Sequence, residues 1–131
     1  MRQEILDFVQ TLNLGTVTVS TEVPYEENGV QLYIKNLKKV YIDTDNVEIE
    51  PITQSLDGVN ISNEVTSVRL FFACDAKTLL PNYEDIVADL KTAKDITTIT
   101  GVQRRECDVT STTEGDVLLT ELEYRFTKLS T

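Results

Sequence analysis

The apolar positions follow a helical period at the start of the chain. The first dozen residues place apolar side chains at the i, i+3, i+4 and i+7 positions of an amphipathic helix. These positions are Ile5, Phe8, Val9 and Leu12. Asn13 and Gly15 follow, and both residue types tolerate the left-handed backbone conformation that ends many helices. We therefore expect a short N-terminal helix that depends on tertiary packing for its stability.

Alternation of apolar and polar residues begins at Thr16 and predicts a series of strands. Pro51 favours an edge strand, because proline cannot donate a hydrogen bond to a neighbouring strand. Every second residue from Val68 to Cys74 is apolar, so this part of the chain is expected to form a central strand. The expected extended segments are residues 16–20, 30–35, 40–43, 47–52 and 64–74.

A second helix and a hairpin complete the predicted fold. Asn82 is a suitable N-cap, and the helix that follows it should end near Lys94, before a β-branched stretch. Residues 102–110 and 116–128 predict the two arms of a hairpin, joined by a loop over residues 111–115. The expected fold class is α+β, with a mostly antiparallel sheet, two helices packed on one face and a long closing β-hairpin. We expect a single domain spanning residues 1–131.

The composition argues against catalysis and against binding of a nucleic-acid backbone. The chain has no histidine, which removes the commonest general base and the commonest metal ligand. Its net charge of -10 leaves no positive surplus to displace the counterions of a phosphate backbone. The acidic run at residues 43–50 lacks the glycine that an EF-hand loop needs at its sixth position. We therefore expect no catalytic residue, no cofactor and no metal site.

The cysteines and the N-terminus indicate where the protein resides. Cys74 and Cys107 match no zinc-binding spacing, and we expect two buried thiols in a reducing cytosol. The first eight residues mix acids with apolar residues, which is unlike a signal peptide. No apolar run approaches the length of a bilayer span. These patterns predict a soluble intracellular protein that does not associate with membranes.

Acidic and basic residues are segregated along the chain. Residues 41–67 contain six acids and no lysine or arginine, whereas short basic clusters occur on either side of the acidic segments. Oppositely charged patches on one protein can join copies head to tail, and ordinary solvated surface charge is the alternative interpretation. The candidate contacts between subunits or with a partner are Lys35, Lys38, Lys39, Arg104 and Arg105.

The order of these elements resembles the tail terminator proteins of long-tailed bacteriophages, with the lambda type as the nearest comparison. Two local features carry the resemblance. Arg104-Arg105 is followed by acidic residues that lead into a polar loop, and the last strand alternates from Leu118 to Phe126. The similarity extends over nearly the whole chain as a pattern of elements, and the length of the chain agrees with it.

This resemblance implies a virion protein that forms a hexameric ring on the tail tube. The ring would stop polymerisation of the tube and offer the surface to which the head attaches, without catalysis or a cofactor. The implied partners are further copies of the chain, the major tail tube protein and a head completion protein, while DNA passes through the ring without specific binding. The protein would reside in the virion tail and, during assembly, in the host cytoplasm. A head-closure or joining protein, a tail tube protein and a small α+β ligand-binding module remain alternatives.

Overall fold

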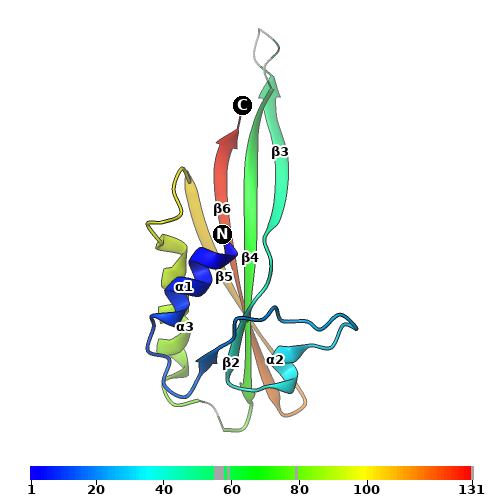
Figure 1. Ribbon diagram of the computed structural model, residues 1–131, viewed down its shortest axis with the longest axis vertical. Coiled ribbons are helices and arrows are strands. Elements are labelled where there is room, and N and C mark those ends of the chain that lie inside the picture. Colours follow the sequence, from blue (N-terminus) through cyan, green and yellow to red (C-terminus); the bar gives the residue numbers. More distant parts are fainter. Residues whose placement is uncertain (55–57, 59, 79, 131) are drawn as a thin grey trace.

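Long strands run along the molecule, and helices lie beside only part of their length (Figure 1). The structure is a computed structural model that describes residues 1–54, 58, 60–78 and 80–130. Its elements are α1 Arg2–Gln10, β1 Thr18–Val19, α2 Leu32–Lys35, β2 Lys39–Ile42, β3 Asn46–Gln54, β4 Asn60–Asp75, α3 Tyr83–Lys91, the 3-10 helix η1 Thr92–Asp95, β5 Arg104–Glu114 and β6 Val117–Ser130.

Strand β4 is the central strand of the sheet, as its apolar alternation predicts. The strand order is β1-β2-β4-β6-β5, and β3 also pairs with β4. Strand β6 pairs with β4 from Ser62 to Asp75. Along the other edge of β4, β3 pairs with residues up to Ser67, and β2 pairs at Leu70 and Phe71. These pairs are antiparallel and only β1 and β2 are parallel among the described strands, which confirms the mostly antiparallel α+β fold.

The main core lies between the sheet and a layer formed by α1, α3 and η1. Every second side chain of β4 from Val68 to Cys74 is fully buried in it. The helices contribute Ile5 and Leu90, which are also fully buried. The hydroxyl group of Tyr124 donates a hydrogen bond of 2.6 Å to the carbonyl oxygen of Leu90 and so satisfies a buried polar group. The expected packing of two helices on one face of the sheet is confirmed.

A smaller core on the opposite face corrects the prediction for residues 30–35. This segment was expected to be extended, but Leu32–Lys35 forms the single turn of α2. Leu32 and Tyr33 are adjacent and both pack in the same buried cluster, where the Tyr33 ring stacks on Phe71 with 4.7 Å between centroids. In a strand, these two side chains would point to opposite faces. A helical turn lets both reach the sheet, and this packing overrides the local alternation.

The closing hairpin is longer than predicted. Residues 111–115 were expected to form a loop, but β5 continues to Glu114 and the turn is limited to Gly115 and Asp116. Ser, Thr and Thr at positions 111–113 are compatible with a strand, and Thr is a favoured strand residue. Gly115 has a φ of 59°, which a tight turn between two strands requires.

Two local predictions are confirmed only in part, and the edge strand at Pro51 is confirmed. Strand β1 comprises two residues of the expected segment 16–20, because among the described residues it pairs only with the short strand β2. Asn82 occupies the N-cap position of α3, but its φ is 62° and its side chain makes no capping hydrogen bond. Strand β3 pairs only with β4 among the described residues and shifts register between Pro51 and Thr53, in agreement with an edge strand.

Replacement of Leu90 by alanine tests the importance of the main core. Because Leu90 is fully buried, Leu90→Ala should lower the free energy of unfolding by about 2–5 kcal/mol. Denaturant unfolding of the purified variant measures this change. Leu129 is 49% exposed, so Leu129→Ala is a matched control expected to change stability by less than about 1 kcal/mol. Equal losses in the two variants would contradict this account of the core.

Candidate interaction surface

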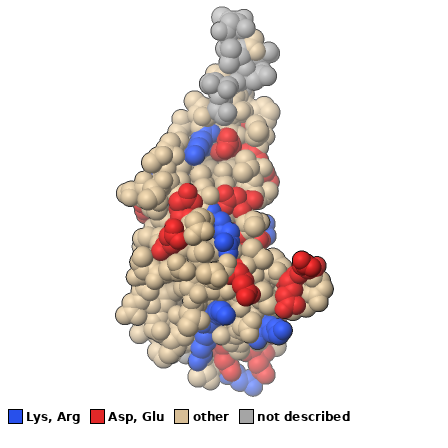
Figure 2. All heavy atoms as spheres, viewed as in Figure 1, with Lys and Arg blue, Asp and Glu red and all other residues tan. Residues whose placement is uncertain are grey.

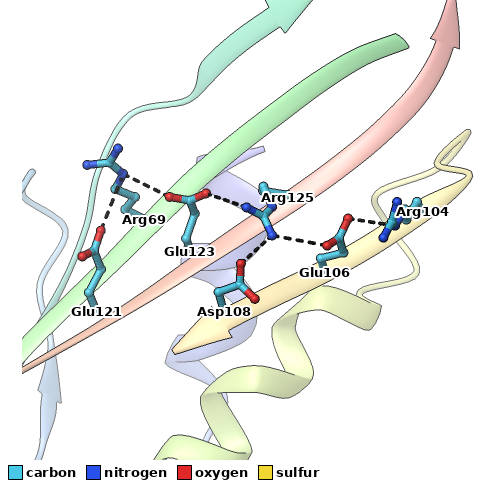
Figure 3. A network of polar contacts seen from close by, with 7 residues as sticks. All are labelled: Arg69, Arg104, Glu106, Asp108, Glu121, Glu123 and Arg125. Carbon is cyan, nitrogen blue, oxygen red and sulfur yellow. Dashed lines mark hydrogen bonds and ion pairs between the residues drawn. The ribbon is translucent and has the colours of Figure 1, made fainter. Parts of the chain in front are cut away.

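One face of the sheet carries a row of ion-paired residues, and this face is opposite α1 and α3 (Figure 3). Alternate side chains of a strand point to opposite faces, so the strand register decides which charges meet. Arg69 of β4 lies opposite Glu123 of β6. Arg125 of β6 lies opposite Glu106 of β5. The members of this row, termed the charge ladder, are Arg69, Arg104, Glu106, Asp108, Glu121, Glu123 and Arg125.

Arg125 is the centre of the charge ladder. Its Nη2 atom lies 2.5 Å from Asp108 Oδ2 and 3.3 Å from Glu106 Oε2. Its Nη1 atom lies 3.5 Å from Glu123 Oε1. Burial opposes the charge of Arg125, but the nearby carboxylates outweigh burial and raise the pKa of its guanidinium. Strands β5 and β6 therefore hold this cation between three anions.

The two remaining arginines extend the ladder toward its ends. Arg69 Nε lies 3.6 Å from Glu121 Oε1 and 3.5 Å from Glu123 Oε2. Arg104 Nε lies 2.9 Å from Glu106 Oε1. Every guanidinium of the ladder thus has a carboxylate partner, and the carboxylates outnumber the guanidiniums by four to three. An anionic ligand that approaches an arginine of the ladder would therefore meet at least one carboxylate beside it.

A hollow of about 540 Å³ lies between the ladder and β3. It is lined by Arg69, Glu123 and Arg125 of the ladder and by further polar residues. Four additional carboxylates line it, and these are Asp43, Asp45, Glu48 and Glu50. The hollow and the ladder together form an acidic, exposed part of the sheet face that repels anions.

The three candidate lysines remain close together. Lys35 is exposed, and its Nζ atom lies 3.8 Å from a carboxylate oxygen of Glu26. Lys38 lies in the turn between α2 and β2, where it makes no salt bridge to a described residue. Lys39 places its ammonium group 5.9 Å from the centre of the Tyr41 ring. Lys35 and Lys38 are exposed and Lys39 is half-buried, so all three lysines are accessible in or beside this turn.

Arg104 and Arg105 do not form one basic patch. They are neighbours in β5, so their side chains point to opposite faces of the sheet. Arg104 belongs to the charge ladder. Arg105 turns toward the helices, donates hydrogen bonds of 3.0 Å to the carbonyl oxygens of Lys94 and Ile96, and also binds the carbonyl oxygen of Ile99. The guanidinium of Arg105 therefore holds the segment after α3 against β5.

The sequence contains a signal for the charge ladder that the prediction of interface residues missed. Glu121, Glu123 and Arg125 alternate in β6, as Glu106 and Asp108 do in β5. Charges of opposite sign at every second position of both arms of a hairpin must lie on one face. Grouping the charges by their proximity along the chain instead joined Arg104 to Arg105 and overlooked two further arginines, in β4 and β6.

The two thiols are held in their protonated form. Cys74 is buried in the main core, and burial raises its pKa. Cys107 is partly buried, and burial raises its pKa to about 11. A thiol with a raised pKa is a weak nucleophile near neutral pH, because the thiolate is the reactive form.

Metal sites, membrane spans and known families add few constraints on function. Within the described ranges, no group of three His, Cys, Asp or Glu side chains is placed to hold a metal ion. Among the same residues, no helix combines the length and the apolar character that a membrane crossing requires. No protein-family model matches the chain, and no match was found among curated proteins. The features that define the site are therefore those of the chain itself, an acidic ion-paired sheet face and a separate turn of lysines.

Replacement of each arginine separately tests their different roles. Arg105→Ala should lower the free energy of unfolding by about 1.5–3 kcal/mol, because several carbonyl oxygens lose a charged donor. Arg104→Ala should change it by less than about 1 kcal/mol, because its ion pair is exposed. Thermal and denaturant unfolding measure both changes. A larger effect of Arg104→Ala than of Arg105→Ala would refute this assignment.

The raised pKa of Cys107 predicts a loss of stability at high pH. An unfolded chain would ionise this thiol near pH 9, whereas the folded chain keeps the proton until about pH 11. The unfolded state then binds fewer protons, so stability falls as the pH rises from about 9 to about 11. Unfolding measured across this range should show a shallower decline for Cys107→Ala. An identical pH dependence of the two proteins would contradict the prediction.

Proposed function

We propose that the chain is a ring-forming subunit of a phage tail and acts as a tail terminator. The observation that carries this proposal is the strand order where β3 and β5 reach the same level of the sheet. At residues 65–67 of β4 the order across the sheet is β3, β4, β6 and β5, and each neighbouring pair is antiparallel. The two outer strands, β3 and β5, therefore run in opposite directions.

This order allows the sheet to continue from one copy to the next. In the described part of the chain, β3 pairs only with β4 and β5 pairs only with β6, so each has an unpaired edge. Strand β3 of one copy could pair with β5 of the next copy, and the alternation of directions would be preserved. Val47 and Ile49 of β3 are 53% and 67% exposed, which is unusual for an edge strand that remains uncovered. Head-to-tail contacts of this kind close into rings when the rotation permits.

One face of the sheet is covered by helices and the other is not, and this difference indicates which face would line the ring. The layer of α1, α3 and η1 makes one face of the subunit bulkier. In a ring, this bulkier face is accommodated on the outside, where the circumference is longer. The charge ladder and its acidic hollow would then face the lumen. An acidic lumen whose arginines are already paired would repel the phosphates of DNA and let DNA pass without being held.

The resemblance to tail terminators supplies the position of this ring. One face of the ring would contact the last ring of the major tail tube protein, and the opposite face would receive the head completion protein. The terminator function requires that the ring does not stack on itself, whereas a tail tube protein would continue to polymerise. A monomeric ligand-binding module would form neither assembly. The states of assembly therefore separate the main alternatives.

Electron microscopy and native mass spectrometry of the purified chain test this proposal. We expect single closed rings with six copies that do not stack into filaments. Long filaments would favour a tail tube protein instead. A chain that stays monomeric at millimolar concentration, with or without tail tubes, would overturn the proposal.

Substitution of the exposed edge strand gives a second test of the ring. Val47→Lys combined with Ile49→Lys should abolish rings, because charged side chains on an edge strand oppose pairing with another strand. The monomer should remain folded, because both side chains are exposed. A control with lysines at Thr16 and Thr100, two exposed positions outside β3, should still form rings. Unchanged rings in the β3 variant would exclude this edge as the contact.

A further inference from the structure

A second hollow of about 490 Å³ lies on the helix side of the molecule, between α1 and the segment that follows η1. Phe8 and Ile96 form its apolar part. Glu4, Asp7 and Asp95 also line it, and none of its lining residues is a lysine or an arginine. This hollow, termed the acidic groove, fits a partner segment that combines an apolar side chain with cations.

The chain itself carries such a segment between α2 and β2. This segment, termed the lysine turn, comprises residues 35–39 and has lysines at three of its five positions. Leu37 lies among these lysines and is 42% exposed. The backbone of Lys38 is fixed, because its N–H donates to Ala73 over 2.7 Å and its carbonyl oxygen accepts from Thr18 over 3.0 Å. Lys38 also has a φ of 60°, an uncommon conformation for a residue other than glycine. The turn thus presents Leu37 and the lysines on a well-held backbone.

We propose that the lysine turn of one copy docks in the acidic groove of the next copy. In this contact Leu37 lies against Phe8 and Ile96, and the lysines face the carboxylates of Asp7 and Asp95. The occupant is inferred from charge complementarity and from the exposed leucine at the centre of the turn. The proposal rests on the ring function and deepens it, since it names a contact between neighbouring subunits.

The placement of the two surfaces determines the type of association. Figure 1 shows α1 and α2 on either side of β4. In Figure 2, acidic residues are visible near α1, and basic residues lie around α2 and β2 together with acidic ones. Because the groove and the turn are different surfaces, each contact leaves one groove and one turn free at the two ends of an assembly. Only closure of a ring satisfies all of them, as expected for a heterologous interface.

Two charge-reversal variants test this contact. The turn variant carries Lys35→Glu and Lys38→Glu, and the groove variant carries Asp7→Lys and Asp95→Lys. All four side chains belong to residues that are exposed, so both variants should keep the stability of the natural chain. Each variant alone should associate at least about tenfold more weakly than the natural chain, because attraction is replaced by repulsion. Sedimentation velocity over a concentration series measures this change.

A mixture of the two variants gives the decisive result. The acidic turn of the first variant fits the basic groove of the second, and the lysine turn of the second fits the acidic groove of the first. An equimolar mixture should therefore regain the association of the natural chain, with the variants alternating around the ring. A control with Asp85→Lys and Asp89→Lys has the same change in charge on exposed residues of α3, and it should associate normally. A mixture that stays as weak as its components would overturn the contact.

Cross-linking separates a failure of this contact from a failure of the ring. Leu37→Cys and Thr97→Cys, introduced in separate chains and mixed, should give dimers with a short bifunctional maleimide, whereas Leu37→Cys mixed with Thr16→Cys should not. If rings form without this cross-link, and if both charge variants form rings as well as the natural chain does, the contact would be overturned and the ring proposal would stand. A specific cross-link in open chains that never close would support the contact and overturn the ring. If neither rings nor open chains form and no cross-link appears, both proposals would be overturned.

Discussion

Burial of strand β4 on both of its faces is the constraint on which the rest of the structure depends. One set of its side chains, from Val68 to Cys74, lies under the helical layer. Phe71 points to the other face and is covered by α2. The same strand pairs with β6 on one edge and with β2 and β3 on the other. The helices, the sheet and the small second core therefore all meet at a single segment, and loss of its packing would affect each of them.

Strand β4 is no longer buried on both faces where its residues become polar, and the charge ladder begins at that point. Beyond the α2 cluster, the face of β4 opposite the helical layer continues with Arg69 and Ser67 rather than with large apolar residues. The register then brings Glu123 and Arg125 of β6 beside them. Exposed ion pairs of this kind contribute little to stability. Their main effect is electrostatic, since they neutralise the arginines and leave the excess of carboxylates to set the potential of the face.

Features that depend on local periodicity could be predicted from the amino-acid sequence. These are the two principal helices, the central strand, the edge strand at Pro51 and the fold class. Prediction failed where a tertiary contact decided the local structure, as at Leu32 and Tyr33, which form a helical turn because both are buried in one cluster. Grouping charged residues that are neighbours in the sequence also did not predict the charge ladder, because the charges of the ladder meet across neighbouring strands. The lysines remained together because they share one turn, whereas alternation in β5 separated Arg104 from Arg105.

The proposed ring requires copies with a net charge of -10 to associate, so the distribution of charge must matter more than its sum. At physiological ionic strength the Debye length is about 8 Å, and charges separated by more than this distance interact weakly. Carboxylates that face one another across a lumen wide enough for DNA are screened in this way. The lysines and carboxylates of a docked turn and groove would be in contact, where attraction between them is strongest. A strongly acidic chain can therefore line a channel with carboxylates and still be joined to its neighbours by the few lysines of a single turn.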